Sequence, residues 1–316
     1  MTLQQLLYFL AVADTRHFTR AAERAYVAQP SLSKQIRALE DELGAALFSR
    51  ARGNITLTPA GEALLPIARR ILSDVDTARL EIAELVGLRR GRVRVGATPS
   101  LCVSLFADVL RRFHGEYPGV ELVVAESGSK DLVGALTHGE LDLAVLTAPE
   151  RGEEAALTKT PILKERLVVA SAEPLGKSVS LRSLRDRPLV MFREGYDLRD
   201  TTLNACHAAG FEPRFTVQGG EMDAVLRFVE IGLGVAIVPS IVVAGRAGLY
   251  AAPLRDPVIS RTIALAHRTD TAPTHAARAF RATLLAHLHT APLPAGVHEV
   301  SPWPDGESGP DDDRVP

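Results

Sequence analysis

The chain has 316 residues and a formal net charge of −2 at pH 7. This length accommodates two domains, and 46% hydrophobic with 23% charged residues excludes a disordered or fibrous chain. The charge is unevenly placed: residues 16–37 hold five cations and one acid, whereas residues 299–316 hold six acids and one cation. A basic segment of this kind favours contact with nucleic acid, which the near-neutral total conceals.

The cellular compartment is indicated by the low cysteine count and by the lack of signal-peptide and membrane-span patterns. Two cysteines, Cys102 and Cys206, are too few for a disulfide framework or a thiolate metal site and fit a reducing compartment. The apolar segment 6–13 has no basic residues before it, as a signal peptide requires. The uncharged run 231–245 is short and interrupted by glycine and proline, so it does not predict a membrane span. We therefore expect a cytoplasmic protein without membrane contact.

Two short helical patterns lie back to back between residues 16 and 52, with a tight break at residues 26–28. Apolar residues recur at helical spacing in both, namely Phe18, Ala21, Ala22 and Ala25, then Leu32, Ile36, Leu39 and Leu43. Pro30 suits a first helical turn, and Gly44 is placed to end the second helix. The polar face of that helix carries short hydrogen-bonding groups and two cations, which predicts a recognition helix for a DNA major groove.

This segment resembles the N-terminal domain of LysR-type transcriptional regulators. The matching words are FTRAAER, AQPSLSKQIRALEDELGAALFSR and LTPAG, in the family's order after a first helix at residues 3–13. The resemblance implies a winged helix-turn-helix DNA-binding domain over residues 1–58, with the helix-turn-helix motif at about 18–37. Two positions depart from the pattern: Ala25 replaces a frequent leucine, and Ala28 replaces a frequent capping hydroxyl, so the cap is expected to be absent or supplied by Gln29.

Base and phosphate contacts are expected from the recognition helix, the start of the preceding helix and the base of the wing. Glutamine suits adenine, arginine or lysine suits guanine, and serine suits either bases or phosphates. The predicted DNA-binding residues are Thr19, Arg20, Gln29, Pro30, Ser31, Ser33, Lys34, Arg37, Arg50 and Arg52. For any single residue, the alternative is a solvated polar side chain with no DNA contact.

A long helix is predicted over residues 59–90, capped by Thr58. Its apolar residues follow the 4-3 spacing of a heptad seam: Leu64, Ala68, Ile71, Val75, Ala78, Ile82 and Leu85. Such a seam predicts dimerisation, and the alternative is a helix packed on its own domain. In the resembled family this linker helix pairs two subunits, and tetramers are common, although the spacing itself supports a homodimer.

From residue 91 the pattern changes to alternating strands and helices, which predicts an α/β domain with a parallel sheet. The resemblance implies an effector-binding domain over residues 91–291, two-lobed and similar to periplasmic binding proteins. Lobe I is expected at about 91–161 plus 267–291, and lobe II at about 162–266. The apolar extended runs 163–170 and 259–266 are candidates for two strands that cross between the lobes. Residues 292–316 are predicted to be a disordered, acidic and proline-rich tail.

A small, anionic effector is expected between the lobes. Hydroxyls and N–H groups at the strand-to-helix turn 96–100 suit a carboxylate or another anion, and the alternative role of Thr98 and Ser100 is simple helix capping. With the positions that the resemblance implies, the predicted effector-binding residues are Thr98, Ser100, Ser129, Phe192, Arg193, Leu198 and Gly219. The sequence does not identify the effector.

Three alternatives are weighed against a regulator. The segment 194–200 resembles that of the peroxide-sensing branch of the family, but Asp197 stands at the position of the first reactive cysteine, so a two-cysteine switch with Cys206 cannot form. A solute-binding protein is disfavoured by the basic N-terminal domain. An enzyme is disfavoured because the P-loop, the G-x-S-x-G elbow, the H-E-x-x-H motif and the C-x-x-C motif are missing. We therefore predict a LysR-type regulator that is not an enzyme and has no cofactor or metal, binding an interrupted palindromic operator as a homodimer or homotetramer.

Overall fold

The computed structural model describes residues 1–49, 55–85, 91–148 and 156–300, and for residues 83–85 it describes the backbone alone. The predictions at Arg50, Arg52, the Leu85 side chain and residues 301–316 lie outside the described atoms. The described residues form two compact units, one made chiefly of residues 1–91 and the other of residues 92–300. Among the described residues, no helix has the length and apolarity needed to cross a membrane.

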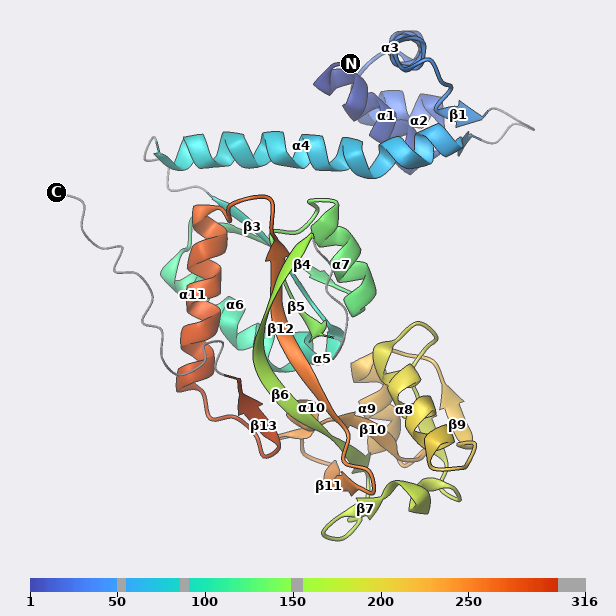
Figure 1. Cartoon of the computed structure of the whole chain (residues 1–316), viewed down its shortest axis with the longest axis vertical. Helices are drawn as coiled ribbons and strands as arrows, with labels where there is room; N and C mark the ends of the chain where they lie inside the picture. Colours follow the sequence, from blue (N-terminus) through green and yellow to red (C-terminus); the bar gives the residue numbers. More distant parts are fainter. Residues whose placement is uncertain (50–54, 86–90, 149–155, 301–316) are drawn as a thin grey trace, which may run out of the picture. The chain divides into compact units, whose positions relative to one another are not determined.

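The first unit is a winged helix-turn-helix domain followed by a long helix (Figure 1). Its elements are α1 (Leu3–Thr15), α2 (Phe18–Arg24), α3 (Gln29–Leu43), β1 (Phe48–Ser49), β2 (Thr56–Leu57) and α4 (Pro59–Leu85). Phe9, Leu32, Ile36 and Leu39 are fully buried in its core. As predicted, α3 ends at Gly44, whose φ of 68° is the left-handed conformation that glycine adopts without strain.

The start of α4 is fixed by the LTPAG segment. Thr58 Oγ1 accepts a hydrogen bond from the Gly61 backbone N–H at 3.1 Å, which caps the helix. A Cβ atom on Gly61 would lie 2.2 Å from the Leu47 carbonyl oxygen, so only glycine allows this close approach. The segment therefore fixes the start of the long helix against the winged-helix core.

The predicted dimerisation seam divides into two parts along α4. Ala68 is fully buried in the unit's own core, and Leu64 and Ile71 are partly buried against the same core. At Ala68 the predicted seam is therefore wrong, because this position is already covered by its own domain. Farther along, Val75 is half-buried, and Ala78 and Ile82 are exposed, Ile82 by 62%.

The second unit is an α/β domain with one large mixed sheet. Its sheet runs in the order β4 (Glu121–Glu126), β3 (Arg92–Ala97), β5 (Leu143–Ala148), β12 (Ser260–Arg268), β6 (Leu157–Ser171), β11 (Tyr250–Arg255) and β7 (Val179–Ser180), while β10 (Ala236–Pro239) and β13 (Val297–Glu299) also pair with β6. A separate parallel pair joins β8 (Leu189–Met191) and β9 (Phe215–Gln218). The parallel pairing of β3 with β4 and β5 confirms the parallel sheet predicted for lobe I.

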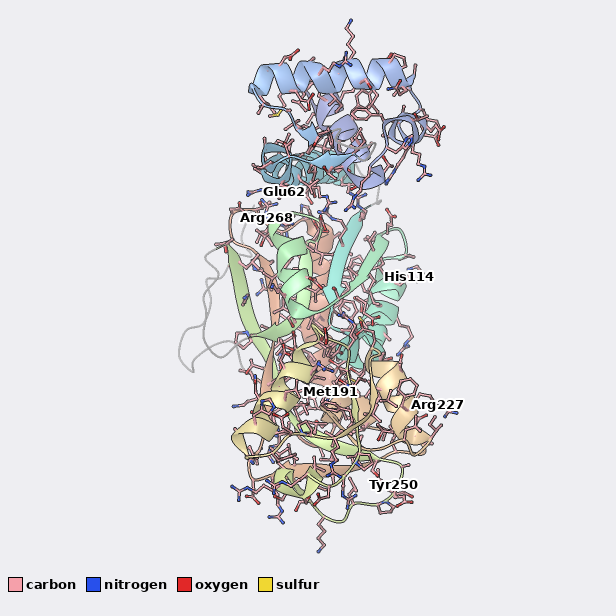
Figure 2. The ribbon with its side chains drawn as sticks, turned by 90° about the vertical axis from the view of Figure 1, so that its right-hand side faces the viewer. Glu62, His114, Met191, Arg227, Tyr250 and Arg268 are labelled. Atoms are coloured by element: carbon pink, nitrogen blue, oxygen red, sulfur yellow. The ribbon has the colours of Figure 1, made fainter. Side chains whose placement is uncertain are left out.

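Helices cover the sheet of both lobes. Lobe I carries α5 (Pro99–Leu101), a π-helical turn at Cys102–Phe106, α6 (Ala107–Glu116), α7 (Ser129–Thr137) and α11 (His275–Thr290), and lobe II carries a 3-10 turn at Leu181–Leu184, α8 (Asp197–Ala208), α9 (Met222–Glu230) and α10 (Ser240–Val243). In Figure 2 the labelled Met191 belongs to the buried core, whereas Arg227 and Tyr250 are exposed. Helix α8 begins at Asp197, where Asp197 and Asp200 lie in the first turn and favour a helix N-terminus.

Strands β6 and β12 pass from one lobe to the other (Figure 1). They pair antiparallel over their whole common length, from Ser260 opposite Arg166 to Arg268 opposite Leu157, with one bulge between Ile263 and Ala264. These are the two crossing strands expected from the apolar runs. The predicted lobe boundaries at residues 161 and 266 fall inside them, so the two lobes share one continuous pair of strands.

The predicted disordered tail begins too early. Residues 297–299 form β13, and Val297, which is 4% exposed, pairs with Glu165 of β6. The turn before it uses Gly296 at a φ of 88°. The acidic, proline-rich composition predicted disorder, but β6 supplies backbone hydrogen-bond partners and Val297 packs into an apolar core. Neither contact can be predicted from a local stretch of sequence.

Candidate DNA and effector sites

Helix α3 separates its apolar and polar residues. Leu32, Ile36 and Leu39 are buried in the unit, and the side chains between them face outward. Of the predicted contacts, Gln29, Pro30, Ser31, Lys34 and Arg37 on α3 and Thr19 and Arg20 on α2 are exposed, and Ser33 is half-buried. This arrangement leaves the polar face of α3 available to a DNA groove.

The first turn of α3 departs from the usual cap. Ala28 makes no side-chain cap hydrogen bond, and the hydrogen bond of the Gln29 side chain runs from its Nε2 to Ser33 Oγ at 2.9 Å. Of the two possibilities left open by the sequence, the cap is therefore absent. The Gln29–Ser33 bond instead orients two predicted base-contacting groups relative to each other.

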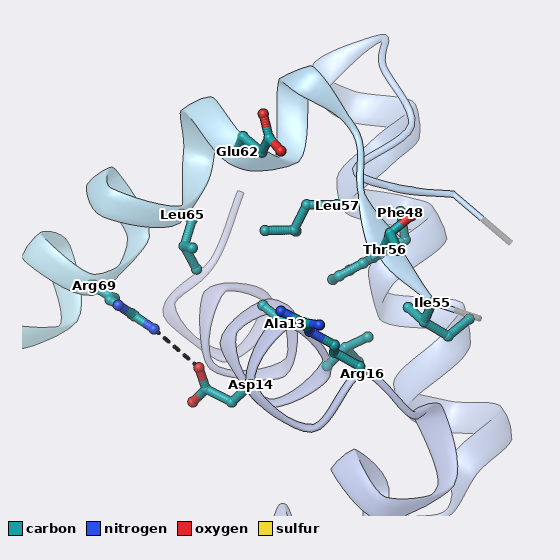
Figure 3. A pocket seen from close by; sticks show the side chains of 11 residues that line it. Ala13, Asp14, Arg16, Phe48, Ile55, Thr56, Leu57, Glu62, Leu65 and Arg69 are labelled. Carbon is teal, nitrogen blue, oxygen red and sulfur yellow. Dashed lines mark hydrogen bonds and ion pairs between the residues drawn. The ribbon is translucent and has the colours of Figure 1, made fainter. Parts of the chain in front are cut away.

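A hollow of about 490 Å³ lies where α1, the wing strands and α4 meet (Figure 3). Asp14 at the end of α1 pairs with Arg69 of α4 at 3.2 Å, and Arg16 and Glu62 also line the hollow. The ion pair joins α1 to α4 inside this unit. Its side chains are more than a third exposed, so it contributes little to stability.

The effector unit contains a buried ion pair on its two crossing strands. Arg261 of β12 lies directly opposite Glu165 of β6, and its Nε donates to Glu165 Oε1 at 2.7 Å. Their side chains are 9% and 2% exposed. Sequence reasoning missed both residues, because they are 96 positions apart and no local pattern links them.

The predicted turn at residues 98–100 meets this ion pair. Arg261 Nη2 donates to Ser100 Oγ at 2.7 Å, and Thr98 Oγ1 lies 3.4 Å from the same oxygen. Arg261 Nη1 also reaches Thr147 Oγ1 at 3.5 Å. A guanidinium beside three hydroxyls forms a site suited to a carboxylate or another anion.

Lobe II reaches the same place through the start of α8. Ser129 Oγ of lobe I donates to Asp197 Oδ2 at 2.6 Å and accepts from the Thr147 N–H at 3.2 Å. Thr98, Tyr196, Asp197 and Arg261 line a cavity of only about 10 Å³ between the lobes. The cleft is therefore closed, and Ser129 and Asp197 hold its two sides together.

The remaining predicted effector residues lie behind this cleft or at its edge. Phe192 and Leu198 are buried in the core of lobe II, and the Phe192 ring stacks on Tyr196 with centroids 4.7 Å apart. Arg193 donates to Glu221 at 2.5 Å, and Gly219 adopts a φ of 120° at the end of β9. The structure thus gathers Thr98, Ser100 and Ser129 around Arg261 and Asp197, whereas Phe192 and Leu198 support the wall.

Both cysteines are thiols that burial keeps protonated. Burial, and then the nearby Glu126 charge, raises the pKa of Cys102 to about 12, and burial, followed by the charge of Glu212, raises the pKa of Cys206 to about 11. A thiolate is the reactive form, and its fraction falls as the pKa rises. Neither cysteine has the environment of a redox sensor.

We expect both cysteines of the folded protein to resist iodoacetamide at pH 8. At this pH the thiolate fraction is on the order of 10⁻⁴ for Cys102 and 10⁻³ for Cys206, against about a quarter for a free cysteine. Labelling followed by mass spectrometry measures this, with the urea-unfolded chain as the control in which both residues react. Labelling of the folded chain at the unfolded rate would contradict it.

The chain joins a helix-turn-helix unit, whose recognition helix has an exposed polar face, to a two-lobed unit with a buried polar cleft. These two features together define a ligand-responsive DNA-binding regulator. A family model described as "Bacterial regulatory helix-turn-helix protein, lysR family" matches residues 3–62, and one described as "LysR substrate binding domain" matches residues 87–289. The chain belongs to the LysR family of transcriptional regulators. Members of this family are regulators and not enzymes, which confirms the predicted family, fold class and lack of an enzymatic role.

Curated relatives and solved structures agree with this assignment. The chain is 34% identical to the transcriptional dual regulator GltC of Bacillus subtilis over 271 residues, which cover 84% of this chain and 90% of that protein. It is 30% identical to the dual regulator OxyR of Escherichia coli, covering 85% and 90%. A full-length cysteine-to-aspartate variant of Pseudomonas aeruginosa OxyR matches with a TM-score of 0.71 at 30% identity, covering 96% and 99%. CbnR in complex with its target DNA matches with a TM-score of 0.67 at 26% identity, covering 92% and 99%.

Proposed function

We propose that two copies of this chain bind an interrupted palindromic operator in the cytoplasm and that an anionic effector in the lobe cleft controls the complex. The observation that carries the proposal is the division of α3 into a buried and an exposed face. The buried face packs on the winged-helix core, and the exposed face carries Gln29, Ser31, Lys34 and Arg37. These side chains match the groups that read base edges and phosphates. CbnR, a solved relative, is complexed with its target DNA.

Dimerisation is supported by the distal part of α4. Val75, Ala78 and Ile82 continue the heptad spacing beyond the region that the winged-helix core covers, and Ile82 is 62% exposed. An apolar stripe of this kind is stabilised by a partner helix. Pairing two linker helices brings two recognition helices to neighbouring half-sites, which is why we expect an interrupted palindrome. Two such dimers form the homotetramer that is the alternative assembly.

An anionic group on the effector is supported by the cleft. Arg261 presents its guanidinium beside the Ser100, Thr98 and Thr147 hydroxyls, and charge-assisted hydrogen bonds from such groups favour a carboxylate. The closed cleft of about 10 Å³ admits no metabolite, so binding requires the lobes to separate at Ser129 and Asp197. An effector that binds the open geometry better shifts the population toward it.

A footprint on the DNA upstream of its own gene tests the regulator function. We expect protection of an interrupted palindrome at a stated salt concentration, because phosphate contacts make affinity depend on salt. The same titration on pooled genomic fragments extends the search to other operators. Absence of protection in both, with and without a metabolite extract, would overturn the proposal.

Substitution of Arg37 tests the recognition face. Arg37→Ala is expected to weaken operator binding by about 10–100-fold, the effect of losing a base contact, without changing the thermal stability. An electrophoretic mobility titration at fixed salt measures it. The matched control is Arg111→Ala, which removes an exposed arginine from α6 in the effector unit. Equal affinity of the Arg37 variant and wild type would remove this residue from the interface.

A further inference from the structure

The hydroxyl of Tyr196 lies in the effector cleft without a hydrogen-bond partner. The residue is 4% exposed, and its oxygen is among the buried polar atoms that no described group bonds. It lines the small cavity together with Thr98, Asp197 and Arg261. A buried hydroxyl left unbonded costs free energy, so this atom indicates a missing partner inside the cavity.

Charges of both signs act on that hydroxyl. They are Arg261 and the carboxylates of Asp197, Glu221 and Glu126, of which Arg261 and Asp197 line the same cavity. Burial is the main cause that raises the pKa of Tyr196, and the three carboxylates add to it against the opposing effect of Arg261. The hydroxyl is therefore neutral and able to donate a hydrogen bond at physiological pH.

The three carboxylates whose charges act on Tyr196 come from different elements. Glu126 ends β4, Asp197 begins α8 and Glu221 precedes α9. Burial, followed by the charges of Glu221 and Asp223, raises the pKa of Glu126. Arg193 pairs with Glu221 Oε1, but Glu221 Oε2 is buried and has no partner among the described residues.

The cavity wall thus offers groups for both charges. Arg261, whose Nε also donates to Glu165, meets the hydroxyls of Ser100 and Thr98, which suit an anion. Asp197 lines the same cavity and suits a cation. Asp197 bonds only the neutral Ser129 hydroxyl across the cleft, at 2.6 Å, among the described residues. An ammonium group is a stronger partner for this carboxylate, because it adds the attraction of a full opposite charge, which the neutral hydroxyl lacks.

We propose that the effector is a zwitterion of the amino-acid class, with its carboxylate on Arg261 and Ser100 and its ammonium group on Asp197. This inference rests on the proposed effector function of the cleft and names the chemical class that the cleft selects. Tyr196 donates a hydrogen bond from its hydroxyl to the carboxylate. The ammonium replaces Ser129 as the partner of Asp197, so ligand entry and the separation of the lobes are the same event.

Calorimetry with the full-length protein tests the class. The probes are the proteinogenic amino acids, each in a set with the 2-oxo acid and the decarboxylated amine of the same carbon skeleton. We expect at least one amino acid to bind and its 2-oxo acid and amine to bind at least about 10–100-fold more weakly, as expected for the loss of one charged hydrogen bond. A 2-oxo acid that binds as tightly as its amino acid, or no binding by any amino acid, would overturn the inference.

Two variants separate this inference from the proposed function. Asp197→Asn keeps the size of the side chain and is expected to weaken amino-acid binding about 10–100-fold while leaving the 2-oxo acid unchanged. Asp108→Asn, an exposed position on α6, is the matched control and should change neither. If Asp197→Asn lowers both affinities equally, the ammonium assignment fails, but an anion-binding cleft remains. Loss of DNA protection in the footprint is a separate result and concerns only the regulator function.

Discussion

Arg261→Ala is expected to destabilise the effector unit by about 3–5 kcal/mol, the cost of leaving one partner of a buried ion pair unpaired. Glu165 is 2% exposed and loses its guanidinium partner, while its second carboxylate oxygen already has no partner among the described residues. For a unit of this size the unfolding temperature should fall by about 6–20 °C. Differential scanning calorimetry of the full chain measures the shift in the transition of this unit.

The double variant distinguishes a lost pair from a general packing defect. Arg261→Met combined with Glu165→Leu removes both charges and keeps most of the buried volume, so stability should return to within about 1–2 kcal/mol of wild type. Arg111→Ala on the surface of α6 is the control and should leave the transition in place. A double variant as unstable as Arg261→Ala would show that the charge left on Glu165 is not the cause.

Ile82→Asp is expected to convert the dimer into monomers and to lower operator affinity by at least about 100-fold. Ile82 is 62% exposed in the single chain, so the substitution should leave the fold of the monomer intact. A carboxylate at a heptad position must be buried unpaired against the partner helix, which opposes association. The monomer retains one recognition helix and one half-site. Sedimentation velocity and a mobility titration on the same samples measure both effects.

Thr77→Asp is the matched control for this substitution. It introduces the same charge five positions earlier on α4, on a different face of the helix from the Val75, Ala78 and Ile82 stripe. We expect this variant to remain dimeric and to bind DNA as the wild type does. Monomers in both variants would indicate a general charge effect, and dimers in both would remove the distal part of α4 from the interface.

Sequence reasoning succeeded where the determinants are local. The period of Leu32, Ile36 and Leu39 predicted the buried face of α3, and Pro30 and Gly44 predicted its ends, because helix periodicity and capping act within a few residues. The family resemblance added the winged-helix and two-lobed architecture. It also directed attention to Thr98, Ser100 and Ser129, which the structure brings together around the cleft.

The sequence by itself thus determined the family and the buried face of α3. Tertiary structure decided the rest: that Ala68 is covered by its own domain, that Val297 joins the sheet as β13, and that Arg261 meets Glu165. These three outcomes depend on contacts between residues far apart in the chain. A local pattern records which face of an element is apolar, but burial and charge pairing depend on which distant element covers that face.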